Sequence, residues 1–245
     1  MDSTLLKGLN VLERLTNSSE PLGVTALATS LDLPKSNIHR TLTTLIAAGY
    51  VAQHQNGSYY PTLRIWQQGV QVMTRHPVRR AAMPYMQSLQ QNTSETINLV
   101  VPDGDDCIYI DQLVSANPLR VSSTVGERAP QLLTVSGRVM LAHHPDAGQR
   151  ARQLYAAQIA PEPPFSLAEL LAELESVRQE GIGMSASVWR PGINSMAAVI
   201  CDAEQMPVGA IAIAGSKTRF TDTRMRELIQ PLMHVCTSIS RTLGA

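Results

Sequence analysis

The sequence predicts an α+β protein in which an N-terminal winged helix-turn-helix domain and a C-terminal mixed-sheet domain are joined by a linker helix. Three observations predict this fold. Apolar residues recur with helical spacing in the first 50 residues, and an Asn-Gly pair then separates two β-prone runs. Beyond residue 93, β-rich and helical stretches alternate. We therefore expect domains over residues 1–61 and 93–245, with linker helices over 62–92.

The first two helices are predicted at Thr4–Thr16 and Thr25–Leu31. Leu5, Leu9 and Leu12 share one face of the first helix, with Leu15 beside them. The break between the helices contains Pro21, and a second turn contains Pro34. The fixed φ of proline suits the first turn of a helix, so Pro34 predicts that a third helix starts there.

The third helix is expected over residues 35–49, ending at Gly49 in a left-handed conformation. Its inward stripe is formed by Ile38, Leu42, Leu45 and Ile46. The opposite face centres on Arg40 and carries small polar side chains, which suit the base edges and phosphates of a DNA major groove. The DNA-binding residues predicted on this helix are Lys35, Ser36, Asn37, His39, Arg40, Thr43 and Thr44. His39 lies near the core edge and packs inward or contacts DNA.

A β-hairpin is predicted over Tyr50–Pro61, with Asn56 and Gly57 at its tip, because Asn-Gly favours a two-residue hairpin turn. A hairpin directly after such a helix is a wing, so Asn56 and Gly57 join the predicted DNA-binding residues. Residues 1–80 hold eight Lys/Arg and four Asp/Glu, although the whole chain is balanced at 20 of each. This basic N-terminal region favours a double-stranded DNA partner.

The segment VTALATSLDLPKSNIHRTLTTLIAAGYV, residues 24–51, resembles the DNA-binding half of the IclR family of bacterial transcription regulators. The resemblance implies that an effector-binding domain follows. Two linker helices are expected at Thr62–His76 and Val78–Asn92, separated by Pro77. Trp66 and Met86 are interpreted as core residues of this region. The family resemblance implies that the region contributes to dimerisation, so we expect a homodimer or a tetramer formed by two dimers.

The C-terminal region is expected to alternate strands and helices. The predicted strands are Thr96–Val101, Cys107–Leu113, Leu119–Thr124, Met184–Trp189, Ser195–Cys201 and Val208–Ala214. The predicted helices are Gly137–His144, Asp146–Ala157, Ser166–Gly181 and Thr221–Leu243. A mixed sheet with helices on it is typical of ligand-sensing domains.

The resemblance to the IclR family continues through this region and covers about residues 4–243. Residues 125–142 are similar to the family's "GxxxPLHxTAxGKALLA", with Arg138 at the position of the family lysine. The resemblance implies a GAF-like domain. It also implies effector-binding positions at Val135, Ser136, Gly137, Ser185, Ser195, Ala212 and Ala214. The sequence departs from the family at an acidic stretch, replaced by residues 185–188, and at a frequent cysteine, replaced by Ser195.

The helix start at Ser136-Gly137-Arg138 favours an anion, because unpaired backbone N–H groups and the helix dipole lie there. Arg138, which we add to the effector-binding residues, and Arg190 are candidate counter-charges or exposed surface groups. We expect a small-molecule carboxylate effector that is larger or more apolar than a two- or three-carbon keto acid, with aromatic acids among the candidates. The alternative is a DNA-binding architectural or partner-recruiting protein without an effector.

Catalytic, metal and membrane interpretations are not favoured. The sequence lacks GxSxG, HExxH and a P-loop, and we expect no enzyme activity and no cofactor. Residues 181–186 fit GxGxxA but follow a helix, the wrong context for nucleotide binding. His143, His144 and the aspartates near Gly104 are interpreted as surface and turn residues rather than metal ligands. The three scattered cysteines predict buried thiols, and no apolar run is long enough to span a membrane, so we expect a cytoplasmic protein.

Overall fold

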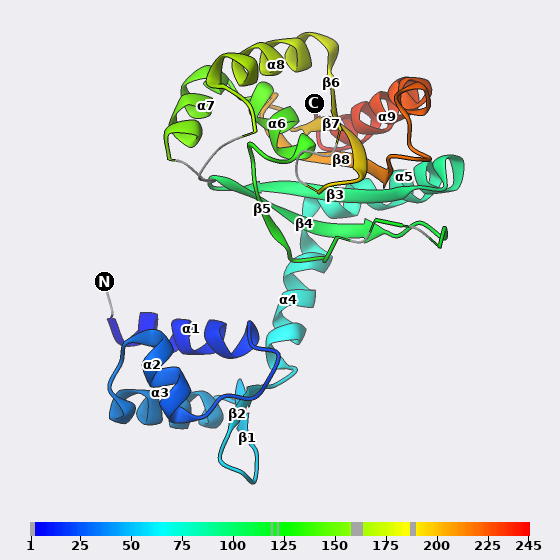
Figure 1. The fold of residues 1–245 in the computed structure, drawn as a ribbon. Helices are drawn as coiled ribbons and strands as arrows, with labels where there is room; N and C mark the ends of the chain where they lie inside the picture. The colour runs from blue at the N-terminus through cyan, green and yellow to red at the C-terminus, as the bar shows by residue number, and fades with distance from the viewer. Residues whose placement is uncertain (1–2, 119, 122, 158–163, 187–189) are drawn as a thin grey trace. The chain divides into compact units, whose positions relative to one another are not determined.

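The computed structural model describes residues 3–118, 120–121, 123–157, 164–186 and 190–245, and it divides the chain into two compact units, residues 1–75 and 76–245 (Figure 1). The first unit contains α1 (Ser3–Thr16), α2 (Val24–Leu31), α3 (Lys35–Ala47), β1 (Val51–Gln53), β2 (Tyr59–Pro61) and α4 (Arg64–Arg75). All five elements predicted before residue 62 are therefore present.

The first unit has its own hydrophobic core. Its buried side chains come from all three of the first helices and from the hairpin, and they are Val11, Leu15, Leu27, Ala28, Ile38, Leu42, Val51 and Tyr59. Sequence periodicity placed part of this core wrongly. Leu5 and Leu9 are 62% and 53% exposed, and Ile46 is 40% exposed. Val11 and Leu15 are the buried residues of α1, because its inward face is rotated from the leucine stripe.

Helix α4 buries none of its residues within this chain. Its exposed apolar side chains include Trp66 at 65% and Val72 at 66%, beside Leu63 at 74% just before the helix. The interpretation of Trp66 as a core residue was therefore wrong for the single chain, whereas Met86 on α5 is fully buried. The reason is that the other elements of its unit pack little against α4.

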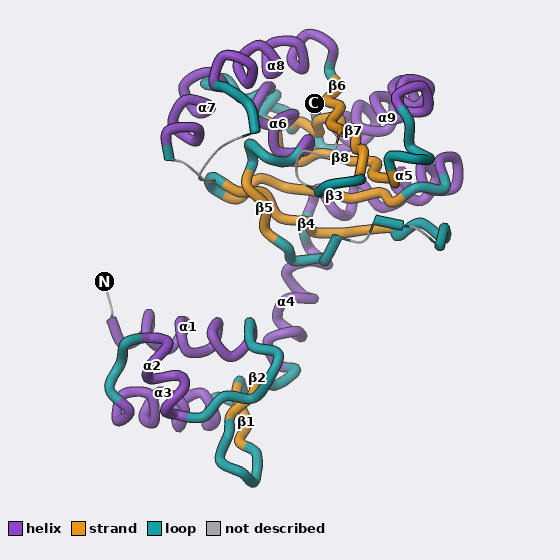
Figure 2. Tube along the Cα trace, viewed as in Figure 1, coloured by secondary structure: helices purple, strands orange, loops and turns teal. Residues whose placement is uncertain are grey.

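The second unit is a six-stranded sheet with helices on both faces (Figure 2). Its helices are α5 (Pro77–Thr93), α6 (Val135–Ala142), α7 (Ala147–Ala156), α8 (Leu167–Glu180) and α9 (Asp222–Thr242). Its strands are β3 (Thr96–Asp103), β4 (Asp106–Leu113), β5 (Arg128–Pro130), β6 (Ile182–Ala186), β7 (Ile193–Cys201) and β8 (Pro207–Ser216). The α+β class is thus confirmed.

The strand order is β5-β4-β3-β8-β7-β6, and every neighbouring pair is antiparallel. The sheet is therefore antiparallel rather than mixed among the described strands. Short turns explain this arrangement, since β3–β4 and β7–β8 are hairpins closed by tight turns at Gly104 and Gln205, both with positive φ. Parallel neighbours would require long crossover connections.

Two predicted strands differ from the structure. Residues 120, 121, 123 and 124 are not in a strand, and the rest of the predicted segment Leu119–Thr124 lies outside the described residues. The edge of β4 pairs instead with β5, whose Arg128 forms ion pairs with Asp103 and Asp106. The strand predicted at Met184–Trp189 begins two residues earlier, at Ile182, and residues 187–189 lie outside the described part of the chain.

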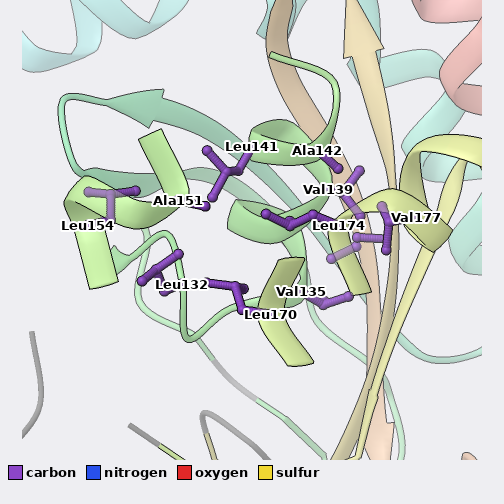
Figure 3. Close-up of a cluster of buried hydrophobic side chains, with 12 residues drawn as sticks. Leu132, Val135, Val139, Leu141, Ala142, Ala151, Leu154, Leu170, Leu174 and Val177 are labelled. Carbon is purple, nitrogen blue, oxygen red and sulfur yellow. The ribbon is translucent and has the colours of Figure 1, made fainter. Parts of the chain in front are cut away.

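Helices α6, α7 and α8 cover one face of the sheet with a single apolar cluster (Figure 3). Val139 of α6 and Leu174 of α8 pack there with Ala197 and Ala212 of the sheet. Helices α5 and α9 pack against each other and against the sheet, and a Cβ at Gly209 would lie 3.2 Å from Val78 of α5, whereas its neighbour Ala210 packs with Met140 of α6. Neighbouring residues of a strand face opposite sides, so α5, with α9 packed against it, covers the other face.

Candidate functional site

The exposed face of α3 carries the residues predicted to contact DNA. The side chains of Lys35, Ser36, His39, Arg40, Thr43 and Thr44 are exposed, and Asn37 is half-buried. The structure thus places His39 on the polar face and not in the core. Ile38 and Leu42 anchor the opposite side of the helix at 0% and 1% exposure. The result is a polar, basic helix face on a rigid support.

Hydrogen bonds within the unit fix part of this surface. The hydroxyls of Thr43 and Thr44 donate to the carbonyls of His39 and Arg40, one turn earlier, at 2.9 and 3.1 Å. Their oxygen lone pairs therefore remain as acceptors on the outer face. Helix α3 ends before Gly49, which has the expected positive φ of 77°.

The hairpin tip is an ordered turn. Asn56 Oδ1 accepts from the backbone N–H of Ser58 at 3.0 Å and from the Ser58 hydroxyl at 2.7 Å. Gly57 has a φ of 85°, a conformation that side-chain-bearing residues adopt rarely. Both tip residues are exposed. The wing thus presents Asn56 and Gly57 to solvent, as predicted.

A cavity of about 50 Å³ lies between the start of α6 and the sheet. Six of the eight predicted effector-binding residues line it, namely Val135, Ser136, Ser185, Ser195, Ala212 and Ala214. The remaining lining residues are Asn98, Tyr109, Val121, Ser123, Leu133, Thr134, Arg190 and Ile193. The strand register explains the meeting of distant positions, because Ser195 pairs with both Ser185 and Ala214.

The start of α6 suits an anion. Thr134 caps the helix, and its hydroxyl accepts from the backbone N–H of Gly137 at 3.0 Å. Among the described residues, the backbone N–H groups of Val135 and Ser136 have no hydrogen-bond acceptor. Both residues line the cavity, where a carboxylate could accept from these groups.

Gly137 and Arg138 do not line the cavity. A Cβ at Gly137 would lie 2.2 Å from the carbonyl oxygen of Gln131, so glycine here allows the chain before α6 to pass against the helix. Arg138 is 2% exposed and donates to Glu173 at 2.7 Å and to the carbonyl of Leu132 at 2.9 Å. It is therefore neither an exposed group nor a counter-charge in the cavity; it ties α6 to α8.

Arg190 does line the cavity, and it is paired. Its Nη2 donates to both carboxylate oxygens of Glu127, at 2.6 and 2.8 Å. Partial burial alone would raise the pKa of Glu127, but hydrogen bonds from Arg190 and from the backbone N–H of Thr124, with the nearby positive charge, lower it overall. Arg190 thus brings a positive charge to a cavity whose other lining groups are neutral.

Several of the lining residues that sequence reasoning missed share one property. Asn98, Tyr109 and Ser123 belong to segments that the sequence predicted only as strands. Alternation along a strand tells which residues share a face, but it does not tell which face holds a cavity. The polar residues Asn98 and Ser123 at buried positions, 2% and 7% exposed, were the available signal.

Other chemistry-bearing groups do not form a site in the described residues. Cys107 and Cys236 are buried and Cys201 is half-buried, and burial raises the pKa of the Cys107 thiol to about 11. Such thiols are poor nucleophiles. The described residues contain no cluster of three or more potential metal ligands. None of the described helices is both long and apolar enough to cross a membrane.

A helix-turn-helix unit with a wing, followed by an α+β domain that holds a cavity, is the organisation of a DNA-binding transcription regulator. Family models match both parts: the IclR helix-turn-helix domain over residues 4–55, and the C-terminal domain of bacterial IclR transcriptional regulators over residues 70–241. The chain belongs to the IclR family. Its members are DNA-binding regulators with an effector-binding C-terminal domain, and not enzymes, as predicted.

Individual relatives agree over nearly the full length. The transcriptional regulator KdgR of Escherichia coli K12 is 28% identical over 99% of this chain and 93% of that protein. The Rhodococcus sp. RHA1 protein RHA06195 has a TM-score of 0.86 at 26% identity, covering 100% of this chain and 99% of that one. An IclR homologue from Microbacterium hydrocarbonoxydans, solved with 4-hydroxybenzoate, has a TM-score of 0.81 at 18% identity, covering 98% and 99%. At 18% identity, the last likeness concerns the fold alone.

Proposed function

We propose that this regulator binds operator DNA through α3 and the wing, and that a carboxylate-bearing metabolite in the cavity at the start of α6 alters this binding. The observation that supports the proposal most directly is the cavity itself. It combines two backbone N–H groups without acceptors, at Val135 and Ser136, with apolar walls at Ala212 and Ala214. The carboxylate would accept from the N–H groups, and the apolar part would lie against the alanines.

The size of the cavity bears on the class of effector. About 50 Å³ is far less than the roughly 300 Å³ or more of typical ligand pockets. An acid with an aromatic ring therefore requires the walls to move apart, whereas a much smaller acid does not. We favour an organic acid with an apolar body. The complex of the Microbacterium homologue with 4-hydroxybenzoate shows that a protein of this fold accepts an aromatic acid.

The test measures operator release by fluorescence anisotropy, with a DNA duplex selected from a random pool and a panel of aliphatic and aromatic acids. The first variant is Ala212→Phe, which would fill the cavity. We expect the effector to change operator affinity in the wild type and to lose this effect in the variant. The effector must bind the DNA-binding conformation and the non-binding conformation with different affinities. A ligand that binds both equally does not change the balance between them.

The matched control is Ala156→Phe, which adds the same ring on an exposed position of α7. This control should respond to the effector as the wild type does. A full response in Ala212→Phe would place the effector elsewhere. A ligand that binds tightly without changing the anisotropy would instead favour the alternative of a DNA-binding protein without effector control.

A further inference from the structure

The ion pair between Arg190 and Glu127 joins opposite edges of the C-terminal sheet. Glu127 immediately precedes β5, which lies at one edge, and Arg190 lies between β6 and β7, at the other edge. The two residues are 63 positions apart in the sequence and are about two-thirds buried or more, with side-chain exposures of 26% and 32%. This salt bridge therefore links the segments next to the two edge strands of the sheet.

One partner of this ion pair lies at the proposed effector cavity. Arg190 itself lines the cavity, and so do Tyr109 and Ser123 from the Glu127 side and Ile193 and Ser195 from the Arg190 side. Glu127 is also held by its own segment: its carbonyl accepts from Tyr109 N–H at 3.0 Å, and its carboxylate accepts from Thr124 N–H at 3.1 Å. Glu127 itself does not line the cavity, but it is bonded to the segments that supply Tyr109 and Ser123, whereas Arg190 lines the cavity directly.

The geometry has a consequence for any anionic ligand. The guanidinium of Arg190 offers its hydrogen bonds to a carboxylate that is already present in the protein. A ligand carboxylate at this end of the cavity would meet the same donors and would be repelled by Glu127. A ligand carboxylate that takes the Nη2 donors therefore replaces Glu127 on Arg190, and this exchange separates the two segments that the ion pair joins.

We propose that the effector carboxylate, held by the N–H groups of Val135 and Ser136, also accepts from Arg190 and displaces Glu127, so that the Arg190–Glu127 clasp opens when the effector binds. This inference rests on the proposed effector cavity. It explains how a cavity of about 50 Å³ accepts an acid of larger volume. It also predicts the sign of a substitution effect: removal of the negative charge at Glu127 strengthens carboxylate binding.

The test measures dissociation constants by titration calorimetry on the full-length protein. The probes are 4-hydroxybenzoate and acetate, each with its neutral amide, 4-hydroxybenzamide and acetamide. For Glu127→Gln we expect about tenfold tighter binding of the acids and little change for the amides, because one competing charge-assisted contact is lost. For Arg190→Gln we expect the preference for acid over amide to disappear, and Arg190→Lys should restore part of it.

The control is Glu227→Gln, which removes the carboxylate of an exposed ion pair with Arg224 on α9 and should leave all four constants unchanged. Glu127→Gln binding both acids no more tightly than wild type would overturn the clasp. So would a preserved acid preference in Arg190→Gln, or no binding of either acid to Glu127→Gln at millimolar concentration. Some other metabolite could release the operator equally well from the wild type and from Glu127→Gln. That result would contradict the role of the Arg190–Glu127 ion pair but would leave the proposed function intact.

Discussion

Arg40 is the clearest single determinant on the proposed DNA surface, because it is exposed at the centre of the polar face of α3. We expect Arg40→Ala to weaken operator binding by about 1–3 kcal/mol if the guanidinium contacts a guanine. If it contacts a phosphate, the slope of log affinity against log salt should fall by about one. Anisotropy titrations at several salt concentrations separate the two cases.

Arg226→Ala, an exposed arginine on α9, provides the control for that loss of charge. Equal weakening by both variants would mean that Arg40 acts only through net charge, and undiminished binding by Arg40→Ala would remove it from the interface. The folded state of each variant is checked by circular dichroism before the titrations.

Individual residues also show which side-chain positions could be predicted from the sequence and which could not. The helical pattern placed Arg40 and the other polar residues of α3 correctly, because their environment depends on local periodicity. Arg138 was misplaced because its partner, Glu173, is 35 positions away and no local pattern reveals it. Arg190 was weighed as a counter-charge, but its pairing with Glu127 depends on the curl of the sheet.

Helix α6 depends on glycine for its place against the preceding chain. A Cβ at position 137 would lie 2.2 Å from the Gln131 carbonyl oxygen and 2.5 Å from Gln131 Cα, both backbone atoms. We expect Gly137→Ala to lower the free energy of unfolding by about 1–3 kcal/mol, since a tightly packed region must shift. Urea denaturation measures the change.

Gly148→Ala is the matched substitution, since Gly148 lies in α7 and its added Cβ would meet nothing within 4 Å. That variant should gain about 0.5–1 kcal/mol through helix propensity. A Gly137→Ala protein as stable as Gly148→Ala would contradict the packing role of Gly137. Loss of effector binding with unchanged stability would instead support the original assignment of Gly137 to the effector site.

The sequence predicted most helices within two residues, because capping and periodicity are local signals. Ser166 caps α8 with Glu169 in a reciprocal pair, and Gly181 ends the same helix at a φ of 74°. The strand predicted at Leu119–Thr124 failed for a different reason. A β-rich segment pairs only if an edge is available, and the edge of β4 is occupied by β5. Sheet order is a property of tertiary structure.

The apolar faces of the first unit predict self-association of the whole protein. Leu5 and Leu9 on α1 and Trp66 and Val72 on α4 are all more than half exposed. We expect a homodimer or a dimer of dimers, and Trp66→Glu should shift it toward smaller species because a charge would be buried at the interface. Light scattering after size-exclusion chromatography measures the mass at micromolar concentration.

Gln68→Glu introduces the same charge at an exposed polar position of α4 and should leave the mass unchanged. A wild-type protein that is monomeric with and without DNA would contradict self-association. Two copies are also expected from the operator, whose half-sites should lie about one helical turn, roughly 34 Å, or a multiple of it apart.

The separate cores of the two units bear on how such a regulator can change over generations. The buried cluster of the first unit draws on residues from Val11 to Tyr59, and the clusters around the cavity draw on residues from Val100 onward. A mutation that changes the polar face of α3 therefore affects the stability of the first unit, and a mutation that reshapes the proposed effector cavity affects the stability of the second. Recognition of a new operator and recognition of a new metabolite can be acquired independently, and in either order.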